Sequence, residues 1–150
     1  MYKHIMVAID DSQTSRKALE EAIAIARLHG APLEIVHAVD EALVQAFKSH
    51  GAALADLGHL EQALEEGGSS LLEEAVDAAK SAGVEARKRL LTFPDTHAAD
   101  QIATAAVESE VDLLVVGSHG RRGVRRLLLG SVAENLVRKV STSILIVRGH

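Results

Sequence analysis

The sequence predicts an α/β fold in which five parallel strands alternate with helices that cover both faces of the sheet. Residues 5–9, 111–116 and 143–147 are apolar runs without polar alternation, the pattern of strands buried on both sides. Segments with apolar residues at helical spacing separate the strands, which favours right-handed parallel crossovers. Hydrophobic residues make up 47% of the chain with only two Phe and no Trp, so the core must consist of Val, Ile, Leu and Ala.

The first half of the chain begins with the strand at 5–9, which an acidic turn at 10–12 interrupts with turn and capping chemistry. The next helix should end at Gly30, because a glycine followed by Pro32 is the usual order of residues after a helix. Residues 33–39 then form the second strand. The apolar stripe of the helix comprises Leu19, Ala22, Ile23 and Ala26.

The middle of the chain contains the segment that the sequence leaves open. Residues 40–68 carry scattered glycines and fragments of helical pattern, and no single form is favoured. Ser70 and Glu73 make a capping box, which predicts that a helix starts there and runs to Ala82. Residues 84–91 mix apolar and charged side chains, as expected of an exposed or edge strand.

The second half repeats the alternation of helix and strand. Asp95 or Thr96 can cap a helix that precedes the strand at 111–116, and Ser131 with Glu134 makes a second capping box before the last helix. The final strand follows directly. The apolar positions of the two helices are Ile102, Ala105, Ala106 and Val107 in the first, and Val132, Leu136, Val137 and Val140 in the second.

Composition excludes several functional classes. A length of 150 residues matches one domain spanning residues 1–150. A net charge of −5 and few aromatic residues disfavour binding to nucleic acid or to anionic membranes. No apolar run approaches the ~18 residues of a membrane span, and the first residues leave no room for a signal peptide. With no cysteine either, we expect a soluble, cytoplasmic protein.

Eight histidines raise the question of a metal site. They are scattered along the chain, with no helical pair three or four residues apart and no thiol to complete a ligand set. We therefore expect no structural metal.

Glycines and serines gather after the fourth strand. Gly117 and Gly120 follow its end, and Gly130 with Ser131 opens the last helix. Glycines let backbone N–H groups approach a phosphate closely, and a helix start offers free amides at the positive end of its dipole. The pattern therefore predicts an anion site. The alternative is structural, with one glycine pair forming a turn and Gly130 and Ser131 only capping the helix.

The spacing Gly117-x2-Gly120-x9-Gly130-Ser131 resembles the ATP-binding signature of the universal stress protein family. Residues 3–12 are similar to the family's first strand and acidic turn, and residues 35–39 to its second strand. The segments 129–134 and 144–147 are similar to its closing helix and strand. The resemblance covers most of the chain but not residues 40–68.

This resemblance implies a Rossmann-like, adenine nucleotide alpha hydrolase-like fold with strand order 3-2-1-4-5, and a homodimer. The last strand is apolar on both faces and would be an edge of the sheet, so pairing with a second copy through Ile144, Leu145, Ile146 and Val147 would cover it; coverage by a loop of the same chain is the alternative. It implies ATP as ligand, with AMP or ADP as alternatives, and Mg²⁺ accompanying the phosphates. Asp10 would lie near the ribose, and Ala133 stands where some members carry a hydroxyl. The adenine would be lined by Ala8, Ile9, Ala38 and Val116, and the ribose and phosphates by Gly117, His119, Gly120, Gly130, Ser131 and Val132.

These positions also have structural interpretations. Asp10 can be a turn or capping residue, the apolar four can be plain core, and His119 can be a solvated loop residue. Four arginines, a quarter of the 16 basic residues, stand in the nine-residue insertion, where together they could face an anion or individually only aid solubility. They are Arg121, Arg122, Arg125 and Arg126.

Three functions remain open. The first, which we favour, is an ATP-binding regulator in the stress response whose nucleotide state is detected by an unidentified partner protein. The second is a slow ATPase or another adenylate-handling enzyme. A P-loop lysine is missing from the sequence, so we do not expect rapid turnover. The third is a dimeric interaction protein that binds AMP or no nucleotide.

Overall fold

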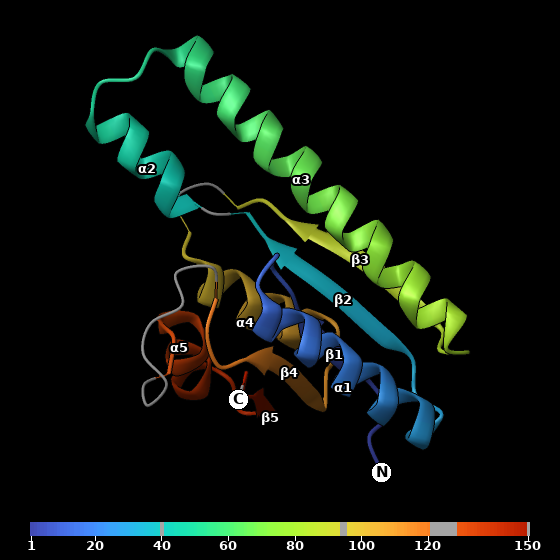
Figure 1. Ribbon diagram of the computed structural model, residues 1–150. Coiled ribbons are helices and arrows are strands. Elements are labelled where there is room, and N and C mark those ends of the chain that lie inside the picture. The colour runs from blue at the N-terminus through green and yellow to red at the C-terminus, as the bar shows by residue number, and fades with distance from the viewer. Residues whose placement is uncertain (40, 94–95, 121–128, 150) are drawn as a thin grey trace.

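The computed structural model describes residues 1–39, 41–93, 96–120 and 129–149, and its strands form one parallel sheet in the order β3-β2-β1-β4-β5. The fold class and strand order predicted above are thus confirmed. The elements, shown in Figure 1, are β1 (Ile5–Ala8), α1 (Gln13–His29), β2 (Leu33–Ala38), α2 (Glu41–Ser49), α3 (Leu54–Ser81), β3 (Ala86–Leu91), α4 (Ala98–Glu108), β4 (Leu113–Gly117), α5 (Ser131–Lys139) and β5 (Ser143–Val147).

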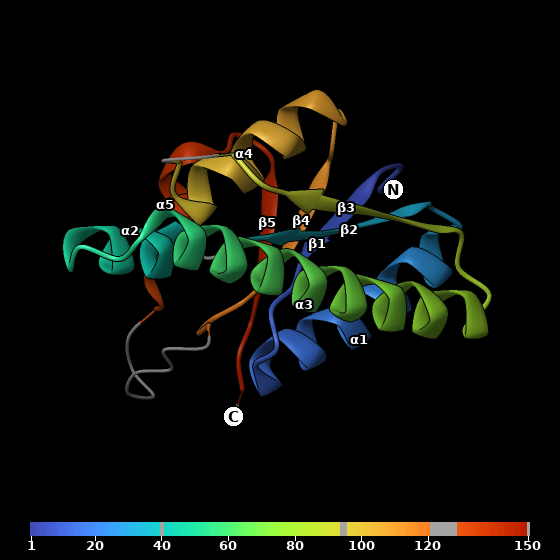
Figure 2. The ribbon, with the colours of Figure 1, turned by 90° about the horizontal axis from the view of Figure 1, so that it is seen from above.

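Helices cover both faces of the sheet. Figure 2 shows α1 and α3 on one side and α4 with α5 on the other. The alternation along each strand divides the core accordingly: Val7 and Ile35 pack with α1 and α3, whereas Met6 and Val36 pack toward α4 and α5. All four side chains are fully buried. The aliphatic composition is therefore sufficient for two cores, one on each face.

The segment whose form the sequence did not predict contains a helical arm, by which we mean α2 and the part of α3 before Gly68. In Figures 1 and 2 this arm extends beyond the end of the sheet. Its two helices contact each other, and each carries a buried apolar side chain, Val44 in α2 and Leu57 in α3. Such packing outweighs the low helix propensity of the interior glycines, because propensity is a weak preference beside tertiary contacts.

Both predicted capping boxes are wrong. Ser70 lies inside α3, which begins sixteen residues earlier, after Ala53 as N-cap. In α5 the N-cap is Gly130, so Ser131 is already the first helical residue. The Glu134 side chain pairs with Arg138 at 3.1 Å instead of reaching back to the helix start.

The cap of α4 also differs from the prediction. His97 is the N-cap residue rather than Thr96, and Asp95 lies outside the described residues. The backbone carbonyl of Thr96 accepts a hydrogen bond from the buried Gln101 side chain at 2.9 Å. Gln101 therefore anchors the chain that leads into α4. The capping of α1 follows the sequence, with Ser12 as N-cap and Gly30 ending the helix in the left-handed conformation at φ 64°.

Three valines assigned to buried helix faces are exposed. Val107 in α4 is 75% exposed, and in α5 Val132 is 37% and Val137 is 47% exposed. The buried stripe of α5 instead contains Ala133 and Leu136. The two sheet edges match their predictions, since β3 is a charged edge strand and β5, apolar on both faces, is the other edge.

Candidate functional site

A cleft lies at the carboxyl edge of the sheet, where β1, β2 and β4 end. Its empty volume is about 540 Å³, part of it open to solvent. In doubly wound sheets this edge is where ligands bind, because the crossovers diverge there. Ten of the eleven predicted site residues line the cleft: Ala8, Ile9, Asp10, Ala38, Val116, Gly117, His119, Gly120, Gly130 and Val132.

The acidic turn after β1 has a fixed geometry. The Ser12 amide donates to Asp10 Oδ1 at 2.8 Å, and the Asp10 amide donates to Ser15 Oγ at 2.8 Å. Ser15 in turn donates its amide to Ser12 Oγ at 3.1 Å, which joins the turn to the start of α1. The other oxygen of Asp10, Oδ2, faces Gly120, since a Cβ on that glycine would lie 3.0 Å from it.

The chain leaving β4 is held close to its neighbours. Ser118 is 1% exposed, and its amide donates to the Val147 carbonyl at 2.8 Å. Its Oγ lies 2.9 Å from His119 Nδ1. A Cβ on Gly117 would approach the Thr14 side chain within 2.9 Å, so this glycine is required for α1 to pack against β4. Gly117 therefore has a packing role in addition to its position in the cleft.

The glycine at the start of α5 completes a backbone-lined hollow. Its amide donates to the Ser118 carbonyl at 2.7 Å. A Cβ on Gly130 would lie 3.1 Å from that carbonyl and 3.2 Å from His119 Cα. Beyond it, the first amides of α5 have no partner within the helix, as at any helix start. A hollow that a single Cβ would narrow, next to a helix N-terminus, fits the phosphates of a nucleotide.

Sequence reasoning placed one residue that does not line the cleft and missed several that do. Ser131 is the first residue of α5 and does not line the cleft. The missed residues come mostly from helix starts that only the fold brings to this edge, although Ser118 stands inside the glycine motif and Ala133 beside it. They are Ser15, Ala98, Ile102, Ser118 and Ala133.

Other sequence expectations concern charge, metals and membranes. The four arginines of the insertion lie outside the described residues. Over the part of the chain that the structure describes, no group of three or more His, Asp or Glu side chains is placed to hold a metal ion. Within the same residues no helix is long and apolar enough to cross a membrane.

A second cleft opens at the amino edge, between the starts of β1, β2 and β3 and the chain that leads from α4 into β4. It is lined by Glu34 and Arg87, whose side chains pair at 3.3 Å, and by His4, Glu85 and Ser109. Charged side chains thus line this opening, whereas the carboxyl edge is lined mainly by small and apolar residues, with Asp10 and His119 as its ionisable side chains.

Comparison with known proteins agrees with this architecture. The model of the universal stress protein family matches residues 1–148. Universal stress protein YxiE of Bacillus subtilis is 32% identical, over 99% of this chain and 100% of the relative. The solved structure of MJ0577 from Methanocaldococcus jannaschii has a TM-score of 0.83 at 25% identity, over 100% of this chain and 98% of that one.

A universal stress protein solved in complex with cAMP is also similar, with a TM-score of 0.70 and 32% identity over 97% of both chains. The strand order, the cleft at the carboxyl edge and the glycine motif beside it are therefore accompanied by a family match along almost the whole length. The chain belongs to the universal stress protein family.

Proposed function

We propose that this protein binds an adenine nucleotide, ATP in the first place, in the carboxyl-edge cleft, and that it acts as a nucleotide-responsive regulator in the stress response. The observation that carries the proposal is the convergence of ten residues, predicted from separate segments of the sequence, on one cleft at the carboxyl edge of the sheet. The similar structure that holds cAMP supports an adenine nucleotide as the class of ligand.

The chemistry of the cleft varies along its length. Small and apolar side chains at the ends of β1, β2 and β4 would accept the flat adenine ring, and Ile102 adds an apolar contact from α4. The Asp10 carboxylate would accept hydrogen bonds from ribose hydroxyls. Gly120, Gly130 and the start of α5 would hold the phosphates through backbone amides. Mg²⁺, when bound with ATP, would neutralise phosphate charge and be held mainly by phosphates and waters.

We further propose a role in binding rather than in rapid catalysis. The sequence contains no P-loop lysine, and Asp10, the carboxylate of the cleft, is engaged by the Ser12 amide. Slow hydrolysis is the alternative. It predicts release of inorganic phosphate from ATP in single-turnover conditions, whereas a binding module would return the ATP intact.

The direct test is calorimetric titration of nucleotide-stripped protein with Mg-ATP, AMP, cAMP and GTP. A Gly130→Val variant is titrated in parallel, because its side chain would fill the hollow beside Ser118 and His119. We expect saturable binding of an adenine nucleotide by the wild type, no binding of GTP, and at least tenfold weaker binding by the variant. Absence of binding for all four nucleotides would leave the dimeric interaction protein as the better hypothesis.

A homodimer through β5 is part of the proposal. This strand is an edge of the sheet, and its apolar residues from Ile144 to Val147 are only half-buried in the single chain. Pairing with a second copy would satisfy the open edge and cover these side chains. Sedimentation should then give twice the mass of the chain, and the apparent Tm should rise with protein concentration.

We also propose that residues 1–150 form a single domain and that the protein acts in the cytoplasm. Two features of the sequence support that location. Without cysteine the chain forms no disulfide bonds, and its negative net charge does not attract it to anionic surfaces. Fluorescence of a tagged chain in cells would test it, and a membrane-bound or exported signal would contradict it.

A further inference from the structure

The peptide that joins Ile9 to Asp10 is held at both of its polar ends by side chains. Its carbonyl oxygen lies 2.7 Å from His37 Nδ1, and its N–H, on Asp10, donates to Ser15 Oγ at 2.8 Å. A carbonyl oxygen can only accept, so Nδ1 carries the proton and donates. This peptide lies one residue beyond the end of β1 at Ala8, where its two polar groups no longer pair with the neighbouring strands.

The orientation of this peptide determines where the Asp10 side chain points. Asp10 Oδ1 accepts from the Ser12 amide, and Oδ2 faces Gly120 across the cleft. Rotation of the peptide would move both oxygens relative to Gly120. The two side chains that hold the peptide come from different elements, His37 from β2 and Ser15 from α1.

Helix α3 lies directly against the His37 ring. A Cβ on Gly68 would come within 2.6 Å of His37 Cδ2 and 2.9 Å of Leu90 Cδ1, closer than real side chains approach, and within 3.2 Å of His37 Nε2. Gly68 is buried, whereas its neighbour Gly67 is exposed and has open space at its Cβ position. An interior glycine costs a helix about 1 kcal/mol relative to alanine, and at position 68 the close contact with His37 explains it.

We propose that His37 and Ser15 are positioning residues that hold the Ile9–Asp10 peptide and thereby aim the Asp10 carboxylate at the bound nucleotide, with Gly68 making room for His37. The inference rests on the proposed nucleotide site and adds to it the residues that position Asp10. It also joins the helical arm to the cleft, because the arm ends at Gly68. A displacement of α3 would act on Asp10 through the His37 ring.

The test compares two single-methyl substitutions at adjacent positions of one helix. Mg-ATP affinity is measured by calorimetry and stability by urea unfolding for the wild type, Gly68→Ala and the matched control Gly67→Ala. We expect Gly68→Ala to weaken binding about three- to tenfold, the effect of disturbing one hydrogen bond. Gly67→Ala should leave affinity unchanged and raise stability, because the exposed helix position gains propensity without a steric contact.

A second pair of variants covers the case in which Gly68→Ala does not fold. His37→Asn retains an amide donor close to the position of Nδ1, whereas His37→Ala removes it. We expect the alanine variant, and likewise Ser15→Ala, to bind Mg-ATP about three- to tenfold more weakly and the asparagine variant to recover most of the affinity.

The outcomes separate this inference from the function on which it rests. Equal Mg-ATP affinity of the wild type, His37→Ala and Ser15→Ala, with only stability reduced, would show that these residues have a packing role and would overturn the inference alone. A wild type that binds no nucleotide would overturn the proposed function, and this inference with it.

Discussion

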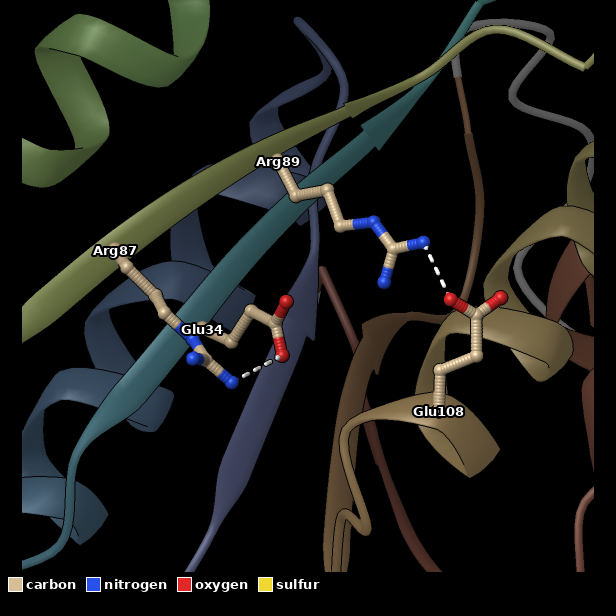
Figure 3. A network of polar contacts seen from close by, with 4 residues as sticks. All are labelled: Glu34, Arg87, Arg89 and Glu108. Carbon is tan, nitrogen blue, oxygen red and sulfur yellow. Dashed lines mark hydrogen bonds and ion pairs between the residues drawn. The ribbon is translucent and has the colours of Figure 1, made fainter.

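The clefts at the carboxyl and the amino ends of the strands, the carboxyl edge and the amino edge, are built in opposite ways. At the carboxyl edge the polar surface consists largely of backbone groups and short side chains, with Gly120 and Gly130 leaving space that a Cβ would fill. At the amino edge charged side chains pair with one another: Arg87 with Glu34 at 3.3 Å, and nearby Arg89 with Glu108 at 2.8 Å (Figure 3). The first arrangement leaves hydrogen-bonding capacity for a ligand, whereas the second uses its charges within the chain.

The largest effect expected from this contrast is that substitutions at the carboxyl edge change nucleotide affinity, whereas substitutions at the amino edge change stability. Gly120→Val should weaken nucleotide binding at least tenfold, about 1.4 kcal/mol, because its side chain would press on Asp10 Oδ2. The free energy of unfolding should change little. Arg87→Met at the amino edge should lower the free energy of unfolding and leave nucleotide affinity unchanged, since distant sites act independently. Calorimetry and urea unfolding of both variants measure the two effects, and a loss of affinity in Arg87→Met would break the comparison.

The carboxyl edge was the easier part to predict from sequence. Its chemistry depends on residues close together along the chain, such as Gly117, Gly120 and Gly130, and on small residues at strand ends, which parallel strands bring to one edge in any register. The pairing of Glu34 with Arg87 joins residues 53 positions apart. It requires the register of β2 against β3, in which these residues are direct neighbours, and no local pattern specifies that register.

The predicted starts of α3 and α5 were wrong for a related reason. Ser70 with Glu73 is a valid local signal, but α3 continues through it because the helix contacts α2 before this point and buries Leu72 in the core after it. Hydroxyl residues were likewise expected to cap α5, yet the close approach of the backbone to Ser118 favours Gly130 at that position. Tertiary contacts decided both cases against the local pattern.

The next prediction concerns the two ion pairs of β3, which differ in burial. Glu34 is only 8% exposed, so Arg87→Met would leave a buried carboxylate without its partner and should cost about 1–3 kcal/mol. Arg89→Met is the matched control, two residues away on the same strand. It leaves Glu108, which is 50% exposed and can be solvated, so the cost should be at most about 1 kcal/mol.

The double variant Glu34→Leu with Arg87→Met identifies the cause of the larger loss. Replacing both charges by apolar side chains removes the unpaired carboxylate and should restore most of the stability. Urea unfolding of the single and double variants gives the three free energies. If Arg87→Met and Arg89→Met lowered the free energy of unfolding equally, the burial of Glu34 would not explain the loss of stability.

The smallest expected effect is a pH dependence at the same edge. Asp112 accepts the amides of Lys3 and His4 at 2.8 and 3.0 Å, which ties the start of β1 to the start of β4. Desolvation by burial raises the pKa of Asp112, but the backbone amides of Lys3, His4 and Asp112 itself, together with the charge of His4, outweigh it and hold the pKa below its ordinary value.

A carboxyl group whose pKa is lower in the folded chain stabilises the fold above its unfolded pKa of about 3.9 and loses that contribution as the pH falls through the folded value. Wild type should therefore be more stable than Asp112→Asn at neutral pH, and the difference should close in strongly acidic solution. Because this carboxylate is only partly buried, solvent screens its interactions and the difference should be small. Unfolding curves across that range measure it, and a gap that stays constant with pH would show that the hydrogen bonds of Asp112 do not depend on its charge.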